Sequence, residues 1–234
     1  MKRPFFPFAI AGAAAGLLLA RLDGPSPAWA GGRDTHVASA DGAVGGRRSE
    51  RTRARLRAGE AGTYIGEMLL ERDSSLARWP DSTRLRVWVQ HAPTLADWDE
   101  RFLDDVRTAF TDWQDTGIPV AFTFVRDSSR ADVHVTWVDS FREPISGKTR
   151  WARDDDWWIV EASIVIAIHH NEGEPLDRAA VRAIALHEAG HLLGLDHSAD
   201  ASNIMTPKVR VRELSAADRA TVQLLYTLPA GTVR

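Results

Sequence analysis

Two histidines and a glutamate toward the carboxyl end of the chain have the spacing of a metal site. His187 and His191 are four residues apart, so on a helix their imidazoles lie on one face and can bind the same metal ion. Glu188 comes one residue after the first histidine, about 100° further around the helix, where it can sit beside the metal without binding it. This position suits a general base.

A glycine and a third histidine extend the pattern. Gly194 comes three residues after His191, where a helix can end because glycine adopts left-handed backbone angles at little cost. The chain can then turn back, so that His197 supplies a third nitrogen. Three protein ligands leave a fourth position for water, which is the open arrangement of a catalytic zinc. The motif HEAGHLLGLDH therefore predicts one catalytic zinc held by His187, His191 and His197, and Glu188→Ala should keep the metal and remove turnover.

The spacing H-E-x-x-H-x-x-G-x-x-H resembles the signature of the metzincin zinc peptidases. Residues 203–207 (NIMTP) are similar to the Met-turn of the matrixin branch, and Ser198 follows the third histidine as in that branch. The resemblance covers roughly residues 82–228. It implies an α+β, metzincin-like zincin fold, in which a twisted mixed β-sheet of about five strands packs on two long helices, with a C-terminal helix after the Met-turn. It also implies that Met205 forms a hydrophobic floor under the histidines without coordinating the metal.

The same resemblance implies a zinc endopeptidase that acts on a protein or peptide substrate. Zinc lowers the pKa of its bound water towards ~7, and Glu188 removes that proton as the water attacks the peptide carbonyl. Two other functions stay open: a zinc-holding binding module of metzincin shape, and a membrane-tethered factor without useful turnover. The presence of Glu188 argues against the binding module, and the amino-terminal residue of the mature protein would decide the other alternative.

The sequence departs from animal matrixins in its metal and latency features. It contains no cysteine, so disulfides are excluded and no thiolate can hold the zinc in a latent form. Residues 139–158 contain no histidine, so a single zinc is expected. His169 and His170 are followed by Glu172 and Glu174, which could bind calcium or could simply form a polar strand end.

Hydrophobic patterns predict the elements that would position this site. Strands are expected at residues 85–89, 120–124, 133–137 and 159–168, the last of them covered on both faces. Helices are expected from Thr94 to Gly117, over about 176–193, and from Ser215 onward. Residues 139–157 are expected to be irregular. The helix that carries the histidines therefore follows a buried strand.

The residues before this body form three segments in the sequence. Residues 1–30 open with two basic residues, run apolar and end in the small-x-small site AWA, which is the pattern of a cleaved signal peptide. Residues 31–60 are rich in Gly, Ala, Ser and Arg, which predicts a flexible linker or pro-segment remnant, or else an arm that touches anionic lipid or cell wall. Residues 61–81 are an N-terminal extension, and residues 82–234 are the predicted catalytic domain.

Composition and charge restrict the partners and the location. The chain has 234 residues, 44% of them hydrophobic, which is enough to bury a core. Lys and Arg number 29 against 32 acidic residues, so the basic surplus of a nucleic-acid-binding protein is missing. The apolar run in the leader is short for a bilayer span, so a secreted, periplasmic or extracellular protein without a stable membrane span is expected. It is expected to be a monomer.

Overall fold

The computed structural model describes residues 40–91, 93–170 and 173–233, and the predicted signal peptide lies outside them. Its helices are α1 (Ala40–Gly59), α2 (Ile65–Glu71), α3 (Phe102–Gln114), α4 (Arg178–Leu192) and α5 (Ala216–Thr227). Its strands are β1 (Ser75–Leu76), β2 (Thr83–Val89), β3 (Val120–Phe124), β4 (Val133–Val138), β5 (Gly147–Arg153), β6 (Ile159–Ala167) and β7 (Gly231–Thr232). Among the described helices, none combines the length and the apolar character that crossing a membrane requires.

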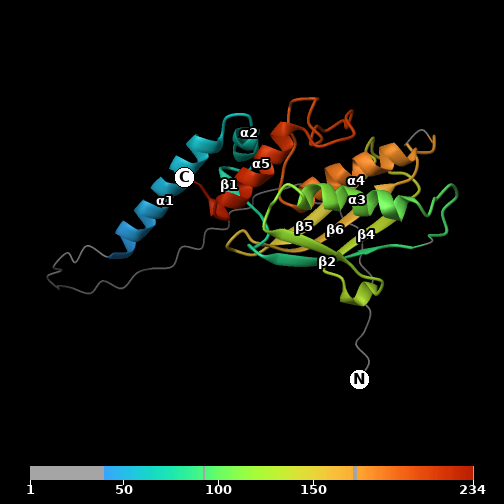
Figure 1. Cartoon of the computed structure of the whole chain (residues 1–234), viewed down its shortest axis with the longest axis horizontal. Coiled ribbons are helices and arrows are strands. Elements are labelled where there is room, and N and C mark those ends of the chain that lie inside the picture. Colours follow the sequence, from blue (N-terminus) through green and yellow to red (C-terminus); the bar gives the residue numbers. More distant parts are fainter. Residues whose placement is uncertain (1–39, 92, 171–172, 234) are drawn as a thin grey trace, which may run out of the picture. The chain divides into compact units, whose positions relative to one another are not determined.

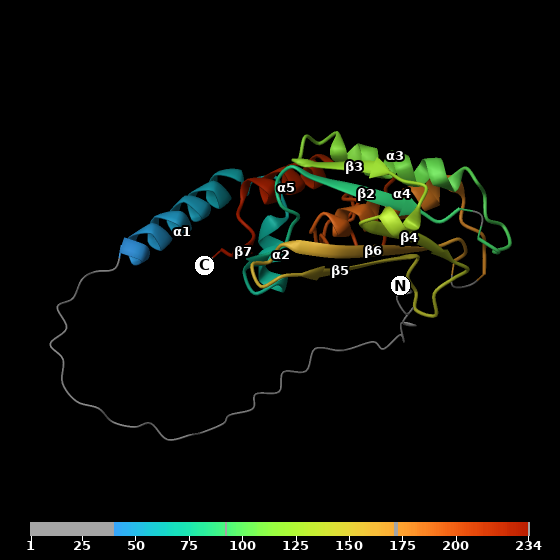
Figure 2. The same ribbon diagram turned by 90° about the horizontal axis from the view of Figure 1, so that it is seen from below.

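One mixed sheet of five strands has the order β3-β2-β4-β6-β5 (Figures 1 and 2). Strand β2 pairs in parallel with β3 and β4, and β4 pairs in parallel with β6. Strand β5 runs antiparallel to β6 and forms one edge of the sheet. The expected α+β fold with a mixed sheet of about five strands is therefore confirmed.

Helices α3 and α4 lie side by side and pack on the sheet (Figure 1). Helix α3 buries apolar residues spaced three or four apart, so one stripe of it faces the core. The indole Nε1 of Trp113 donates a 2.8 Å hydrogen bond to the carbonyl oxygen of Leu186, which joins α3 to α4. Phe110 meets Phe122 of β3 edge to face, with ring centroids 4.9 Å apart. Helix α4 contacts β5 and β6, and this packing fixes the histidine-bearing helix beside the edge strand.

Two stretches of the predicted catalytic domain differ from the expectation. The helix expected from Thr94 begins only at Phe102, because Asp97 has a left-handed φ of 63° that an α-helix cannot contain. Residues 139–157 were expected to be irregular but include strand β5. The residues of β5 are largely polar, and the strand is ordered by its pairing with β6 rather than by an apolar alternation of its own.

Residues 40–59 form helix α1, within the segment 31–60 that was expected to be a flexible linker or a pro-segment remnant, so this part of it is not an unstructured linker. That expectation rested on the shortage of large apolar residues, but Ala and Arg, which are abundant here, are strong helix formers. Nη1 of Arg55 donates a 3.0 Å hydrogen bond to the carbonyl oxygen of Thr227, and Leu56 packs against the core. Helix α1 is thereby joined to the end of α5. Residues 31–39 lie outside the described part of the chain.

The N-terminal extension, residues 61–81, packs into the same body as the predicted catalytic domain. Tyr64 donates its hydroxyl hydrogen to Oδ1 of Asp218 over 3.1 Å, and its backbone N–H donates to Thr221 of α5. Burial, together with the negative charge of Asp218, raises the pKa of Tyr64 well above its usual range, so the phenol stays a donor. Met68 of α2 is fully buried. The extension is thus an integral layer of the fold.

Candidate metal centre

Helix α4 and the loop that follows it bring the three predicted histidines together. Nε2 of His191 lies 3.1 Å from Nε2 of His187 and 3.2 Å from Nε2 of His197. Across the described residues, these three form the one group of three or more His, Asp or Glu side chains close enough to share a metal ion. Zinc–nitrogen bonds of about 2.0–2.1 Å in a tetrahedral site put neighbouring nitrogens about 3.3–3.4 Å apart. The two separations from His191 are therefore close to those of a zinc site, and all three nitrogens lie within 4.8 Å of one another.

Backbone carbonyls fix the tautomers of two of the histidines. Nδ1 of His187 lies 2.8 Å from the carbonyl oxygen of Ile204, and Nδ1 of His191 lies 3.0 Å from that of Leu195. A carbonyl only accepts, so each Nδ1 carries the hydrogen and each Nε2 keeps its lone pair for a metal. Burial lowers the pKa of His187 to about 4 and that of His191 to about 3. Both imidazoles are therefore neutral at physiological pH, as metal ligands must be.

The chain leaves α4 at the glycine that the sequence pattern assigns to the helix exit. Helix α4 ends at Leu192, and Gly194 has a φ of 99°. A side chain on Gly194 would overlap the carbonyl oxygen of Ala77, so the loop also runs close against the upstream segment. Beyond this turn, Oδ1 of Asp196 accepts a 2.9 Å hydrogen bond from the backbone N–H of His197. The loop thus returns the third histidine to the other two.

Met205 packs beneath helix α4, where the resemblance implied a hydrophobic floor. It is fully buried, and a Cβ on Gly190, between the first two histidines, would overlap its Sδ. The turn around it is anchored on both sides. The N–H of Ile204 donates to Oδ2 of Asp218 over 2.8 Å, and the N–H of Ser198 donates to the carbonyl oxygen of Met205 over 2.9 Å. The buried carboxylate of Asp218 therefore fixes Ile204, whose carbonyl oxygen accepts the hydrogen bond from Nδ1 of His187.

Glu188 is buried between α4 and the edge strand β5. Its Oε2 accepts a 2.6 Å hydrogen bond from the hydroxyl of Thr149. Gly147 leaves room for the carboxylate, because a Cβ at that position would overlap Oε1. Burial raises the pKa of Glu188 to about 7, and the hydrogen bonds with Thr149 oppose this shift. Without a metal ion beside it, the buried carboxyl group therefore has its pKa raised toward the range that suits a general base.

Sequence reasoning missed the two residues of β5 that surround Glu188. Thr149 and Gly147 belong to a stretch expected to be irregular, and Thr149 lies 39 residues before Glu188. No local spacing signals this contact, because it exists only through the pairing of β5 with β6 and the packing of α4 on both strands.

Replacing the hydroxyl of Thr149 tests its role in orienting Glu188. We expect Thr149→Val, which keeps the shape but removes the donor, to lower kcat about tenfold with little change in KM, as fits the loss of one hydrogen bond to a carboxylate. Thr149→Ser keeps the donor and should retain most of the activity. Steady-state hydrolysis of a peptide by both variants measures the effect. Equal losses in the two variants would assign the effect to packing instead of the hydroxyl.

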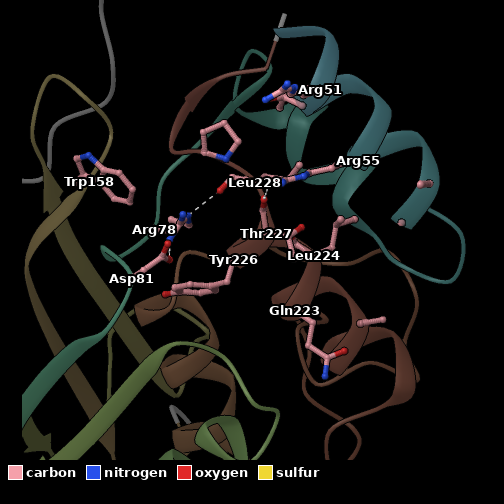
Figure 3. Close-up of a pocket in the computed structure, with 15 residues that line it drawn as sticks. Arg51, Arg55, Arg78, Asp81, Trp158, Gln223, Leu224, Tyr226, Thr227 and Leu228 are labelled. Carbon is pink, nitrogen blue, oxygen red and sulfur yellow. Dashed lines mark hydrogen bonds and ion pairs between the residues drawn. The ribbon is translucent and has the colours of Figure 1, made fainter. Parts of the chain in front are cut away.

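The surroundings of His169 and one large cavity are separate from the group of three histidines. Nε2 of His169 lies 3.2 Å from Oδ2 of Asp97, and its Nδ1 lies 3.2 Å from Oδ1 of Asp139. Glu172 lies outside the described residues, so the calcium alternative stays a prediction. A cavity of about 1360 Å³ lies between α1, α5 and the chain around Arg78, and none of the three histidines lines it. Figure 3 shows the residues that line this cavity.

Comparison with known proteins identifies the family. The matrixin profile of the M10 peptidases matches residues 78–227. Matrix metalloproteinase-C of Caenorhabditis elegans is 28% identical over 178 residues, which cover 67% of this chain and 28% of the relative. Metalloendoproteinase 1-MMP of Arabidopsis thaliana is 29% identical over 154 residues, which cover 53% of this chain and 38% of the relative. The chain therefore spans well under half the length of these curated relatives. Because the profile covers more than half of the sequence, the chain belongs to the matrixin family of zinc metallopeptidases.

Proposed function

We propose that this chain is a zinc endopeptidase in which His187, His191 and His197 hold the metal and Glu188 is the general base. The observation that carries the proposal is the convergence of three imidazole Nε2 atoms on one point, with a buried carboxylate on the helical residue next to the first ligand. When bound, zinc supplies a Lewis acid that polarises a carbonyl and lowers the pKa of a water molecule.

The roles of the protein groups follow from their contacts. Thr149 holds Oε2 of Glu188 by its hydroxyl, which orients the carboxylate to take a proton from the attacking water. The same carboxyl group then returns that proton to the leaving amine, which restores the starting state of the enzyme. Gly147 keeps the carboxylate close to the backbone of β5 because it has no side chain.

The edge strand supports a polypeptide as the substrate. Strand β5 is an outer strand of the sheet, and it reaches Glu188 through Thr149. Extended peptides bind to exposed sheet edges by backbone hydrogen bonds, with little demand on their sequence. A peptide bound along β5 would have its backbone beside the general base, which supports cleavage within unfolded or extended segments of proteins.

The proposed site of action is outside the cytoplasm, in the periplasm or the extracellular medium. The support is the predicted signal peptide at residues 1–30, after whose removal no stable membrane span is expected. Sequencing the amino terminus of the mature protein tests this, because a protein that starts near Gly31 has lost the leader, and an intact leader supports the tethered alternative.

A paired measurement tests the catalytic proposal. Elemental analysis of the purified protein should give one zinc per chain, and hydrolysis of unfolded casein or gelatin should stop when a chelator removes the metal. Activity should return when zinc is added back. Zinc without hydrolysis would favour the binding-module alternative, and absence of zinc would overturn the assignment of the three histidines.

A further inference from the structure

One arginine of the N-terminal extension contacts the loop that joins the second and third histidines. Arg72 follows α2, and its Nε forms a 2.6 Å ion pair with Oδ2 of Asp196. Its Nη1 donates to the carbonyl oxygen of Gly194 over 2.9 Å, and its Nη2 donates to that of Leu195 over 3.3 Å. The guanidinium thus binds three consecutive residues of the loop. Only 15% of the Arg72 side chain and 20% of the Asp196 side chain are exposed, so the pair is poorly screened by solvent.

The loop atoms that Arg72 binds are themselves bonded to two of the three histidines. The Asp196 carboxylate, which uses Oδ2 for Arg72, uses Oδ1 to accept from the backbone N–H of His197. The carbonyl oxygen of Leu195 accepts from Nδ1 of His191. Leu195 and Asp196 therefore connect the guanidinium to His191 and His197, and the charge of Asp196 balances the positive charge that Arg72 brings near a cation site.

Other contacts hold the same loop against the same upstream segment. Oε2 of Glu67 accepts a 2.8 Å hydrogen bond from the N–H of Ala199, and the indole of Trp79 donates a 2.8 Å bond to the carbonyl oxygen of Leu192. Arg72 also lies over the ring of Trp151 in β5, 5.4 Å from its centroid. Arg72 therefore joins α2, the histidine loop and the edge strand in one cluster.

From this geometry we infer that Arg72 is a positioning residue of the metal centre, which sets the zinc affinity by fixing the loop that carries His197. The inference rests on the proposed function, in which His197 is a metal ligand. It extends the zinc site to residues upstream of the segment 78–227 that matches the family. Outer partners that orient metal ligands commonly change metal affinity by about 10- to 100-fold when they are removed.

The test compares Arg72→Met with Arg86→Met in the full chain. Arg86 forms a bidentate ion pair with Asp132, with the same shortest N–O distance of 2.6 Å as the pair of Arg72 with Asp196. The Arg86 pair is more exposed and has no bond to the histidine loop. Metal-free protein is titrated with zinc in competition with a chromophoric chelator, and its unfolding in urea is followed separately. We expect Arg72→Met to raise the zinc Kd about 10- to 100-fold and Arg86→Met to leave it unchanged. Arg72→Lys should be intermediate, because an ammonium can pair with Asp196 but lacks the planar fork that also reaches the loop carbonyls.

The outcomes separate this inference from the proposed function. Zinc binding by Arg72→Met with wild-type affinity overturns the inference, even if its metal-free form is less stable, because the effect of Arg72 is then structural only. If Arg72→Met does not fold, Asp196→Asn decides, since a raised Kd supports positioning through this pair and an unchanged Kd overturns it. A wild-type protein that binds no zinc overturns the proposed function itself.

Discussion

Glu188→Gln is expected to retain one zinc per chain while losing about 10²- to 10⁴-fold in kcat, the range that general acid–base groups contribute. Glutamine has nearly the same size as glutamate, and its amide oxygen can still accept the hydrogen bond that Thr149 donates to Oε2. Packing between α4 and β5 should therefore survive. The amide cannot take a proton from water, so the chemical step loses its base while the three imidazole nitrogens are untouched.

Elemental analysis and steady-state kinetics on the same preparation check this expectation. Glu161→Gln is a matched control, because Glu161 is an exposed residue of β6 and its replacement changes the net charge equally. It should leave kcat unchanged. A Glu188→Gln protein with wild-type turnover would refute the role of this carboxylate, and one that has lost its zinc would show that Glu188 acts in metal binding.

The grouping of the three histidines could be predicted because their spacing is local in the sequence. His187 and His191 lie on one helix, and a helix fixes the relation of residues four apart whatever surrounds it. Gly194 was predicted to end that helix through a left-handed backbone conformation, and its φ of 99° agrees with this prediction. The fold class was implied by the resemblance to the metzincins, and the mixed five-stranded sheet bears it out.

The surroundings of the three histidines and Glu188 could not be predicted, because they come from distant parts of the chain. Thr149 reaches Glu188 from a polar edge strand that has no clear alternation. Arg72 reaches Asp196 across 124 residues, and in the sequence it is one of many arginines. Helix α1 was missed for another reason, since its helix-forming composition also resembles that of a solvated linker. Pairwise contacts of this kind depend on the completed fold.

Gly194→Ala is expected to lower the free energy of unfolding of the metal-free protein by about 2–6 kcal/mol, a large fraction of the roughly 5–15 kcal/mol that stabilises a typical domain. Two effects add. A φ of 99° is strained for any residue with a Cβ, and the new methyl group would overlap the carbonyl oxygen of Ala77. Ala77 is fully buried, so its backbone has little room to move away.

Gly117→Ala separates these two effects, because Gly117 also has a positive φ, of 81°, but a Cβ there would meet nothing within 4 Å. Urea unfolding of both variants should give a loss of about 1–3 kcal/mol for Gly117→Ala, from backbone strain alone, and a clearly larger loss for Gly194→Ala. Equal losses would mean that the loop can move away from Ala77 freely. A larger loss at Gly194 means that the upstream segment restricts the loop mechanically, which is the condition that Arg72 needs to hold His197 in place.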